Sequence, residues 1–127
     1  ADDDLLTSLT EPDKMGDWLT ADDLDFYVNE FTQSGFAGPL NYYRNHNLTW
    51  ELNANKPTQI HQPALFVAGE RDGVIAMAGP ALESMPNFVK DLRTNVLIPK
   101  IGHWTQQEAP DAVNGYLLDW LAGLSQS

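Results

Sequence analysis

"PALFVAGERDG" (residues 63–73) is the most informative stretch of this 127-residue chain for its fold. It holds a continuous apolar run at residues 64–68 and then ends in glycine and charge. Such a run is typical of a strand that is covered on both faces, as the strands of parallel sheets are. "TNVLIPKIG" (residues 94–102) predicts a second short strand over residues 95–98. The two runs together predict an α/β fold with a mainly parallel sheet.

Helical patterns surround the two predicted strands. Thr20 is a predicted N-cap, Gly35 a predicted helix end and Pro110 a predicted first helical residue. The polar residues 53–62 are expected to form a linker. The predicted helices, in chain order, cover residues 21–34, 39–45, 77–85 and 110–124. Two covered parallel strands cannot satisfy their ladder bonds and both apolar faces alone, so we expect further strands before residue 1.

Composition excludes several classes of function. The formal net charge is −11, from 18 acidic and 7 basic residues, which disfavours nucleic acids and anionic membranes as partners. No apolar run approaches the ~20 residues that span a bilayer. The chain has no cysteine, which excludes a disulfide framework and a cysteine nucleophile and fits a cytoplasmic protein.

Two residues that can carry chemistry follow the predicted strands. Asp72 comes after the first strand and His103 after the second. Both exits of a parallel pair lie at the carboxyl edge of the sheet, so an aspartate and a histidine placed there can meet. The aspartate would fix the imidazole tautomer and leave its other nitrogen free to act as a base. Taken singly, Asp72 could be only a turn residue before Gly73, and His103 could be structural.

Other chemistry is not indicated. No tight cluster of His, Asp and Glu is present, so we expect no metal site, and no cofactor is predicted. Tyr43, judged by its spacing alone, would be an aromatic residue that fills core space.

Three segments resemble the C-terminal part of soluble epoxide hydrolases of the α/β-hydrolase superfamily. They are "GFAGPLNYYRN" (residues 35–45), "LFVAGERDGV" (residues 65–74) and "IGHWTQQEAP" (residues 101–110). The resemblance implies the end of a helical cap domain (residues 18–55) and the C-terminal part of the catalytic α/β domain (residues 56–127). Residues 1–17 precede the resemblance, and their acidic residues with Pro12 and Gly16 predict a flexible acidic lead-in.

The resemblance also implies roles for individual residues. Asp72 matches the acid that orients the histidine, and His103 matches the general base. Tyr43 matches one of two cap tyrosines that hydrogen-bond the epoxide oxygen, and Tyr42 stands where relatives often have tryptophan. Tyr42 and Trp104 would line an apolar pocket for small lipophilic epoxides.

The nucleophile that the resemblance implies is absent from the chain. It is an aspartate on a G-x-nucleophile-x-G turn, which this sequence lacks, so it is expected before residue 1 together with the oxyanion hole and the second tyrosine. The intact protein would open epoxides to vicinal diols through an aspartyl ester, and these 127 residues alone would be inactive.

Two alternatives remain open. A haloalkane dehalogenase or an esterase would share the fold. A truncated homologue could instead act as a binding or assembly module without catalysis. Association with the missing N-terminal part, or with a second copy of the chain, is expected because a fragment exposes strand edges.

Overall fold

The computed structural model describes residue 10 and residues 12–125. Within these residues the chain forms seven helices and two strands. The chain divides into two compact units, Ala1–Ser34 and Gly35–Ser127. Among the described residues, none of the helices has the length and hydropathy that a membrane span requires.

The first unit contains α1 (Ala21–Ser34), the helix that the sequence predicts over these residues. Its start is a reciprocal cap. The Thr20 hydroxyl accepts a hydrogen bond from the Asp23 backbone N–H (3.1 Å), and the Asp23 carboxylate accepts one from the Thr20 backbone N–H (2.9 Å). These two bonds satisfy N–H groups that a helix start leaves without partners. Gly35 follows the helix with φ +67°, a conformation that glycine adopts without the cost that a Cβ brings.

Two short helices begin the second unit. They are α2 (Ala37–Arg44) and α3 (His46–Asn53), which contact each other. The sequence predicts α2 with a later start, at Pro39. The helix begins two residues earlier because a proline in the first turn loses no intrahelical hydrogen bond. No prediction covered α3, which has only a weak apolar face.

The two strands are parallel neighbours, as predicted. They are β1 (Ile60–Gly69) and β2 (Val89–Ile98), and the pair ends in register, with Gly69 opposite Ile98. Both strands begin earlier than their apolar runs predict. Their first halves mix polar and apolar residues, so a search for continuous apolar runs finds only the second halves.

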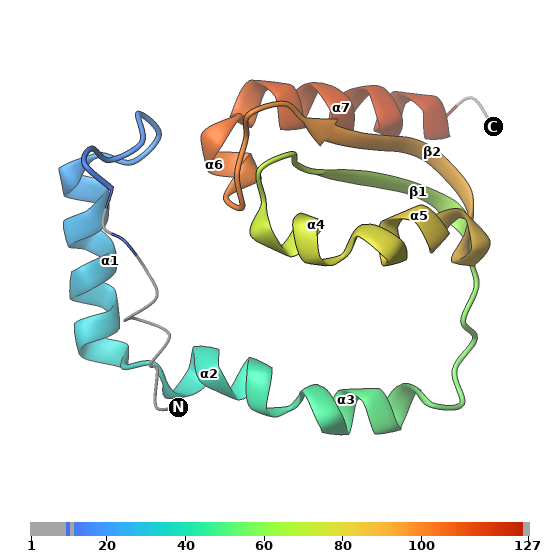
Figure 1. Ribbon diagram of the computed structural model, residues 1–127, viewed down its shortest axis with the longest axis horizontal. Helices are drawn as coiled ribbons and strands as arrows, with labels where there is room; N and C mark the ends of the chain where they lie inside the picture. Colours follow the sequence, from blue (N-terminus) through green and yellow to red (C-terminus); the bar gives the residue numbers. More distant parts are fainter. Residues whose placement is uncertain (1–9, 11, 126–127) are drawn as a thin grey trace. The chain divides into compact units, whose positions relative to one another are not determined.

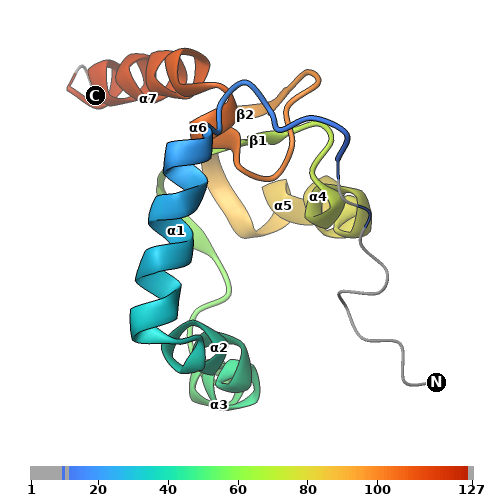
Figure 2. The same cartoon turned by 90° about the vertical axis from the view of Figure 1, so that its left-hand side faces the viewer.

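Helices cover both faces of this sheet (Figures 1 and 2). One face carries α7 (Pro110–Leu124), which contacts both strands and matches the predicted range. The other face carries the connection from β1 to β2, which consists of α4 (Gly73–Met77) and α5 (Gly79–Phe88), where one helix over residues 77–85 was predicted. The short helix α6 (Thr105–Glu108) precedes α7.

The most buried residues gather at one end of the sheet. Ala68 and Ile98 are the buried apolar residues of the described chain, and each lies at the carboxyl end of its strand. The buried polar residues there are Asp72 and Thr105, which follow the two strands. Within the described residues, the carboxyl edge of the sheet is therefore the most buried region, and it also holds these two polar side chains.

Candidate active site

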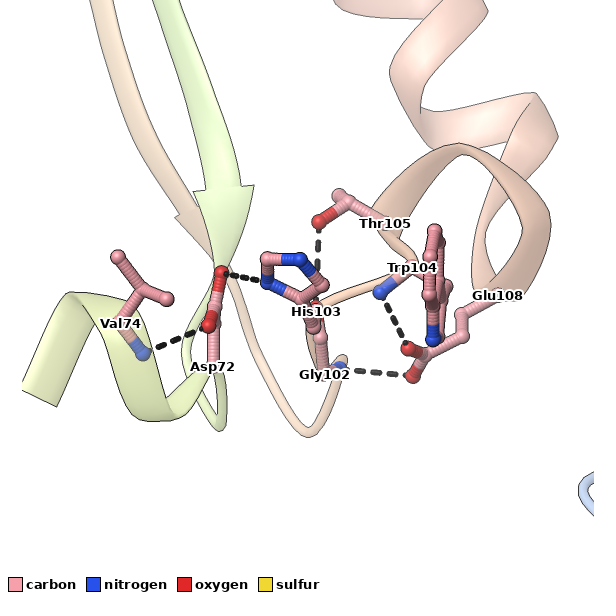
Figure 3. Close-up of polar contacts among 7 residues, drawn as sticks. All are labelled: Asp72, Val74, Gly102, His103, Trp104, Thr105 and Glu108. Carbon is pink, nitrogen blue, oxygen red and sulfur yellow. Dashed lines mark hydrogen bonds and ion pairs between the residues drawn. The ribbon is translucent and has the colours of Figure 1, made fainter. Parts of the chain in front are cut away.

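Asp72 and His103 meet beyond the ends of the two strands, as the sequence predicts. His103 Nδ1 lies 3.0 Å from Asp72 Oδ2, although 31 positions separate the residues (Figure 3). An ionised carboxylate can only accept, so the imidazole donates its Nδ1–H in this bond. This arrangement assigns the proton to Nδ1 and leaves the lone pair on Nε2.

Backbone hydrogen bonds join the two loops that carry this pair. The Glu70 N–H donates to the Ile98 carbonyl (3.0 Å), and the Arg71 N–H donates to the Ile101 carbonyl (2.8 Å). The Glu70 carboxylate also accepts from the Lys100 N–H (3.0 Å), at a turn where Lys100 has φ +67°. Hydrogen bonds thus join the loop after β1 to the end of β2 and the loop that follows it at three points, which are Ile98, Lys100 and Ile101.

The Asp72 carboxylate serves two partners, one with each oxygen. Oδ1 accepts a hydrogen bond from the Val74 N–H (2.8 Å) as the N-cap of α4, while Oδ2 faces His103. Asp72 and Gly73 therefore begin a helix rather than form an isolated turn, and the same carboxylate contacts the histidine. The helix cap fixes the rotamer that the imidazole contacts.

The environment of Asp72 keeps its carboxyl group ionised. Its side chain is only 10% exposed, and burial raises the pKa of the carboxyl group. The hydrogen bonds from Val74 and His103, with the attraction of the imidazolium, outweigh that effect and hold the pKa of Asp72 below its ordinary value. Asp72 is therefore a charged acceptor near neutral pH.

His103 is more open than its partner. Its side chain is 57% exposed, and the neighbouring Trp104 ring meets it edge to face with centroids 5.3 Å apart. Nε2 has no hydrogen bond to another described residue. An imidazole held at one nitrogen and open at the other can accept a proton from a water molecule or a bound substrate.

Glu108 is a further member of the site that the sequence analysis did not identify. Its carboxylate accepts hydrogen bonds from the backbone N–H groups of Gly102 (2.7 Å) and Trp104 (3.0 Å), on either side of His103 (Figure 3). The sequence did hold a signal for this role, because Glu108 is an acidic residue in the first turn of the helix that follows the histidine loop. Such a side chain can reach back to the N–H groups that a helix start leaves without partners.

The two tyrosines are not joined to this pair by any contact among the described residues. Tyr42 and Tyr43 lie on α2, are both exposed, and make ring contacts with each other and with His46. The role predicted for Tyr43 therefore stays a prediction. Within the described part of the chain, no three His, Asp or Glu side chains are grouped to hold a metal ion.

The chain is similar in sequence to proteins that are named epoxide hydrolases. Epoxide hydrolase B of Mycobacterium tuberculosis is 40% identical over 114 residues, which cover 89% of this chain and 32% of that protein. Epoxide hydrolase A of the same organism is 37% identical over 123 residues, which cover 96% of this chain and 38% of that protein. No protein-family profile matches the chain.

A solved structure agrees with the sequence matches. Epoxide hydrolase A from Mycobacterium thermoresistibile superposes with a TM-score of 0.81 at 44% identity, over 90% of this chain and 35% of that one. The chain spans about a third of the length of these two mycobacterial relatives. Its small parallel sheet with helices on both faces is consistent with a C-terminal part of their fold. By sequence and by structure, the chain is a homologue of the epoxide hydrolases, and it corresponds to a segment of their α/β-hydrolase fold.

Proposed function

We propose that the intact protein hydrolyses epoxides to vicinal diols and that this chain supplies the base, its orienting acid and one hydrogen-bond donor. The observation that carries the proposal is the 3.0 Å contact between His103 and Asp72 at the carboxyl edge of a parallel sheet, in a homologue of epoxide hydrolases. The remaining two thirds of the relatives' length provides room for a nucleophile.

The base acts on an ester intermediate. A carboxylate outside this chain attacks an epoxide carbon, the carbon–oxygen bond breaks, and the released ring oxygen takes up one proton from solvent, which leaves an ester of the hydroxyalkyl group. His103 Nε2 then takes a proton from water as the water oxygen attacks the ester carbonyl. The charged imidazole is stabilised by Asp72, and its proton returns to the departing diol oxygen. The carboxylic acid that is released loses its proton to solvent, which balances the proton taken up at ring opening and regenerates the carboxylate, so the cycle needs no cofactor.

Tyr43 serves the first step. The epoxide oxygen becomes an alkoxide as the ring opens, and an alkoxide is a poor leaving group in the absence of a donor. A tyrosine hydroxyl can donate a hydrogen bond to it while remaining neutral near pH 7. The exposure of Tyr43 on α2 supports this role, because the hydroxyl is accessible to a ligand.

The proposal also assigns the domains of the chain, the walls of the substrate pocket and the association of the chain. Residues 18–55 form the end of a cap domain and residues 56–127 the C-terminal part of the catalytic domain, with residues 1–17 as a lead-in. Tyr42 and Trp104, both exposed here, would line the pocket for a lipophilic epoxide. The chain would associate with the rest of the enzyme, in the cytoplasm. Exposed strand edges also favour association of the chain with a second copy of itself.

The test compares Tyr43→Phe with Tyr42→Phe in the natural gene product that carries this sequence. Styrene oxide, a 1-chloroalkane and 4-nitrophenyl acetate serve as substrates. We expect diol formation from the epoxide only, and a fall in kcat of about 100-fold for Tyr43→Phe, because a second tyrosine can retain one hydrogen bond. Tyr42→Phe keeps the ring and should change kcat little. Halide release unaffected by Tyr43→Phe would instead identify a dehalogenase, and no turnover of any substrate would favour the binding module.

A further inference from the structure

We propose that Glu108 is a positioning residue, which fixes the backbone on both sides of His103 and so sets the imidazole against Asp72. Its Oε2 accepts from the Gly102 N–H at 2.7 Å, and its Oε1 accepts from the Trp104 N–H at 3.0 Å (Figure 3). One carboxylate thus holds the two residues that flank the histidine. The two acceptors are rigidly linked, so the spacing of the two N–H groups is fixed as well.

A carboxylate is the side chain that this geometry requires. Each of the two N–H donors here meets a different oxygen of the side chain, whereas an amide offers one oxygen and one NH₂ group. Hydrogen bonds to an ionised acceptor are also stronger than those between neutral groups. Glu108 is half-buried, so these bonds are less exposed to competition from water than bonds on an open surface would be.

The residues around Glu108 are suited to its approach. A Cβ on Gly102 would lie 2.9 Å from Oε1 and 3.2 Å from Oε2 of Glu108, so glycine leaves the space that the carboxylate occupies. The buried Thr105 hydroxyl donates to the Gly102 carbonyl at 3.2 Å. The peptide groups that precede His103 are therefore held at the Gly102 N–H by Glu108 and at the Gly102 carbonyl by Thr105.

Side-chain packing does not fix the orientation of the His103 imidazole. The His103 side chain is 57% exposed, and Trp104, the residue that its ring meets, is 56% exposed. The direction of the imidazole then depends on its backbone and on the single bond to Asp72. If the backbone clamp is released, the loop gains conformations in which Nδ1 no longer reaches Asp72.

The test uses Glu108→Gln and Glu108→Ala in the natural gene product, with Glu83→Gln as control. Glu83 is exposed on α5, so its substitution makes the same charge change away from the site. The primary readout is the NMR signal of the His103 Nδ1 proton and its exchange with solvent. We expect exchange to accelerate about tenfold or more in Glu108→Gln, which loses one bond to a charged acceptor. Glu108→Ala should lose the signal, and Glu83→Gln should match the wild type.

A second readout rests on the proposed function. Slower ester hydrolysis makes the second step rate-limiting, so kcat and KM should fall together, by up to about 100-fold, while kcat/KM for the epoxide changes little. The signal of the His103 Nδ1 proton does not depend on epoxide turnover. An enzyme that is inactive on epoxides would therefore refute the proposed function but not the positioning role of Glu108. A wild-type exchange rate in a folded Glu108→Gln variant would overturn the positioning role. Glu108→Gln preserves the size of the side chain, so the test stands even if Glu108→Ala does not fold.

Discussion

Gly69 and Gly102 pack backbone against backbone, so closely that a Cβ on Gly69 would overlap the carbonyl oxygens of Gly102 and Ile101. Gly69 is the last residue of β1, and Gly102 directly precedes His103. The approach of these two loops is the reason that a histidine can reach an aspartate 31 positions earlier in the chain. Position 69 therefore requires glycine for space.

Gly69→Ala is expected to destabilise the protein and to separate the two loops. The added methyl group meets backbone atoms that cannot rotate away, and overpacking of this kind costs about 1–3 kcal/mol. Gly115→Ala is the matched control, because a Cβ there meets nothing within 4 Å in helix α7. It should raise stability by roughly 0.5–1 kcal/mol. Urea unfolding of both variants measures the contrast, and equal midpoints would contradict the packing argument.

Asp72→Asn is expected to lower kcat of the natural gene product by roughly 10³- to 10⁴-fold. The asparagine amide can donate to Nδ1 and so favours the tautomer with the proton on Nε2, which removes the base. Asp119→Asn, on the exposed face of α7, is the control for loss of one negative charge. Steady-state kinetics with styrene oxide measures both variants. A kcat within a factor of about three of the wild type would remove Asp72 from the mechanism.

Protonation of Asp72 at acid pH should lower the free energy of unfolding. The pKa of Asp72 is lowered from its ordinary value of 3.8, so its ionised form favours the folded state. That contribution is complete above about pH 5 and is lost as the pH falls below 3.8 through the folded value. The free energy of unfolding should therefore decline more steeply with acid in the wild type than in Asp72→Asn. Parallel curves from about pH 6 to pH 2.5 would show that the shift has no energetic consequence.

The 127 residues by themselves are expected not to hydrolyse epoxides. The chain supplies a base and its orienting acid, but the carboxylate that attacks the epoxide carbon is proposed to lie outside it. Diol formation from styrene oxide, followed by chromatography, is the measurement, with the His103→Gln chain as background. Turnover by the wild-type chain above that background would mean that the proposed division of roles is wrong.

The local sequence was sufficient for the elements whose signals are local. Thr20 and Asp23 form the cap that starts α1, and Pro110 starts α7 at the predicted residue. The meeting of Asp72 and His103 also followed from sequence, because parallel strands bring their exits to one edge. The early starts of β1 and β2 did not follow, since ladder pairing with a neighbouring strand, rather than an apolar run, defines those residues as strand.

The sequence by itself determined that an aspartate and a histidine follow two successive parallel strands, and it identified a resemblance to epoxide hydrolases. Only the tertiary structure decided how that pair is held. The packing of Gly69 against the loop before His103 depends on the distance between two loops. The bonds from Gly102 and Trp104 to Glu108 depend on how one loop folds back on the helical turn that follows it. Periodicity and residue type describe one segment at a time. Contacts between a side chain and distant backbone groups require the backbone path that folding fixes, so the sequence could offer Glu108 as a candidate, but only the structure shows which N–H groups it binds.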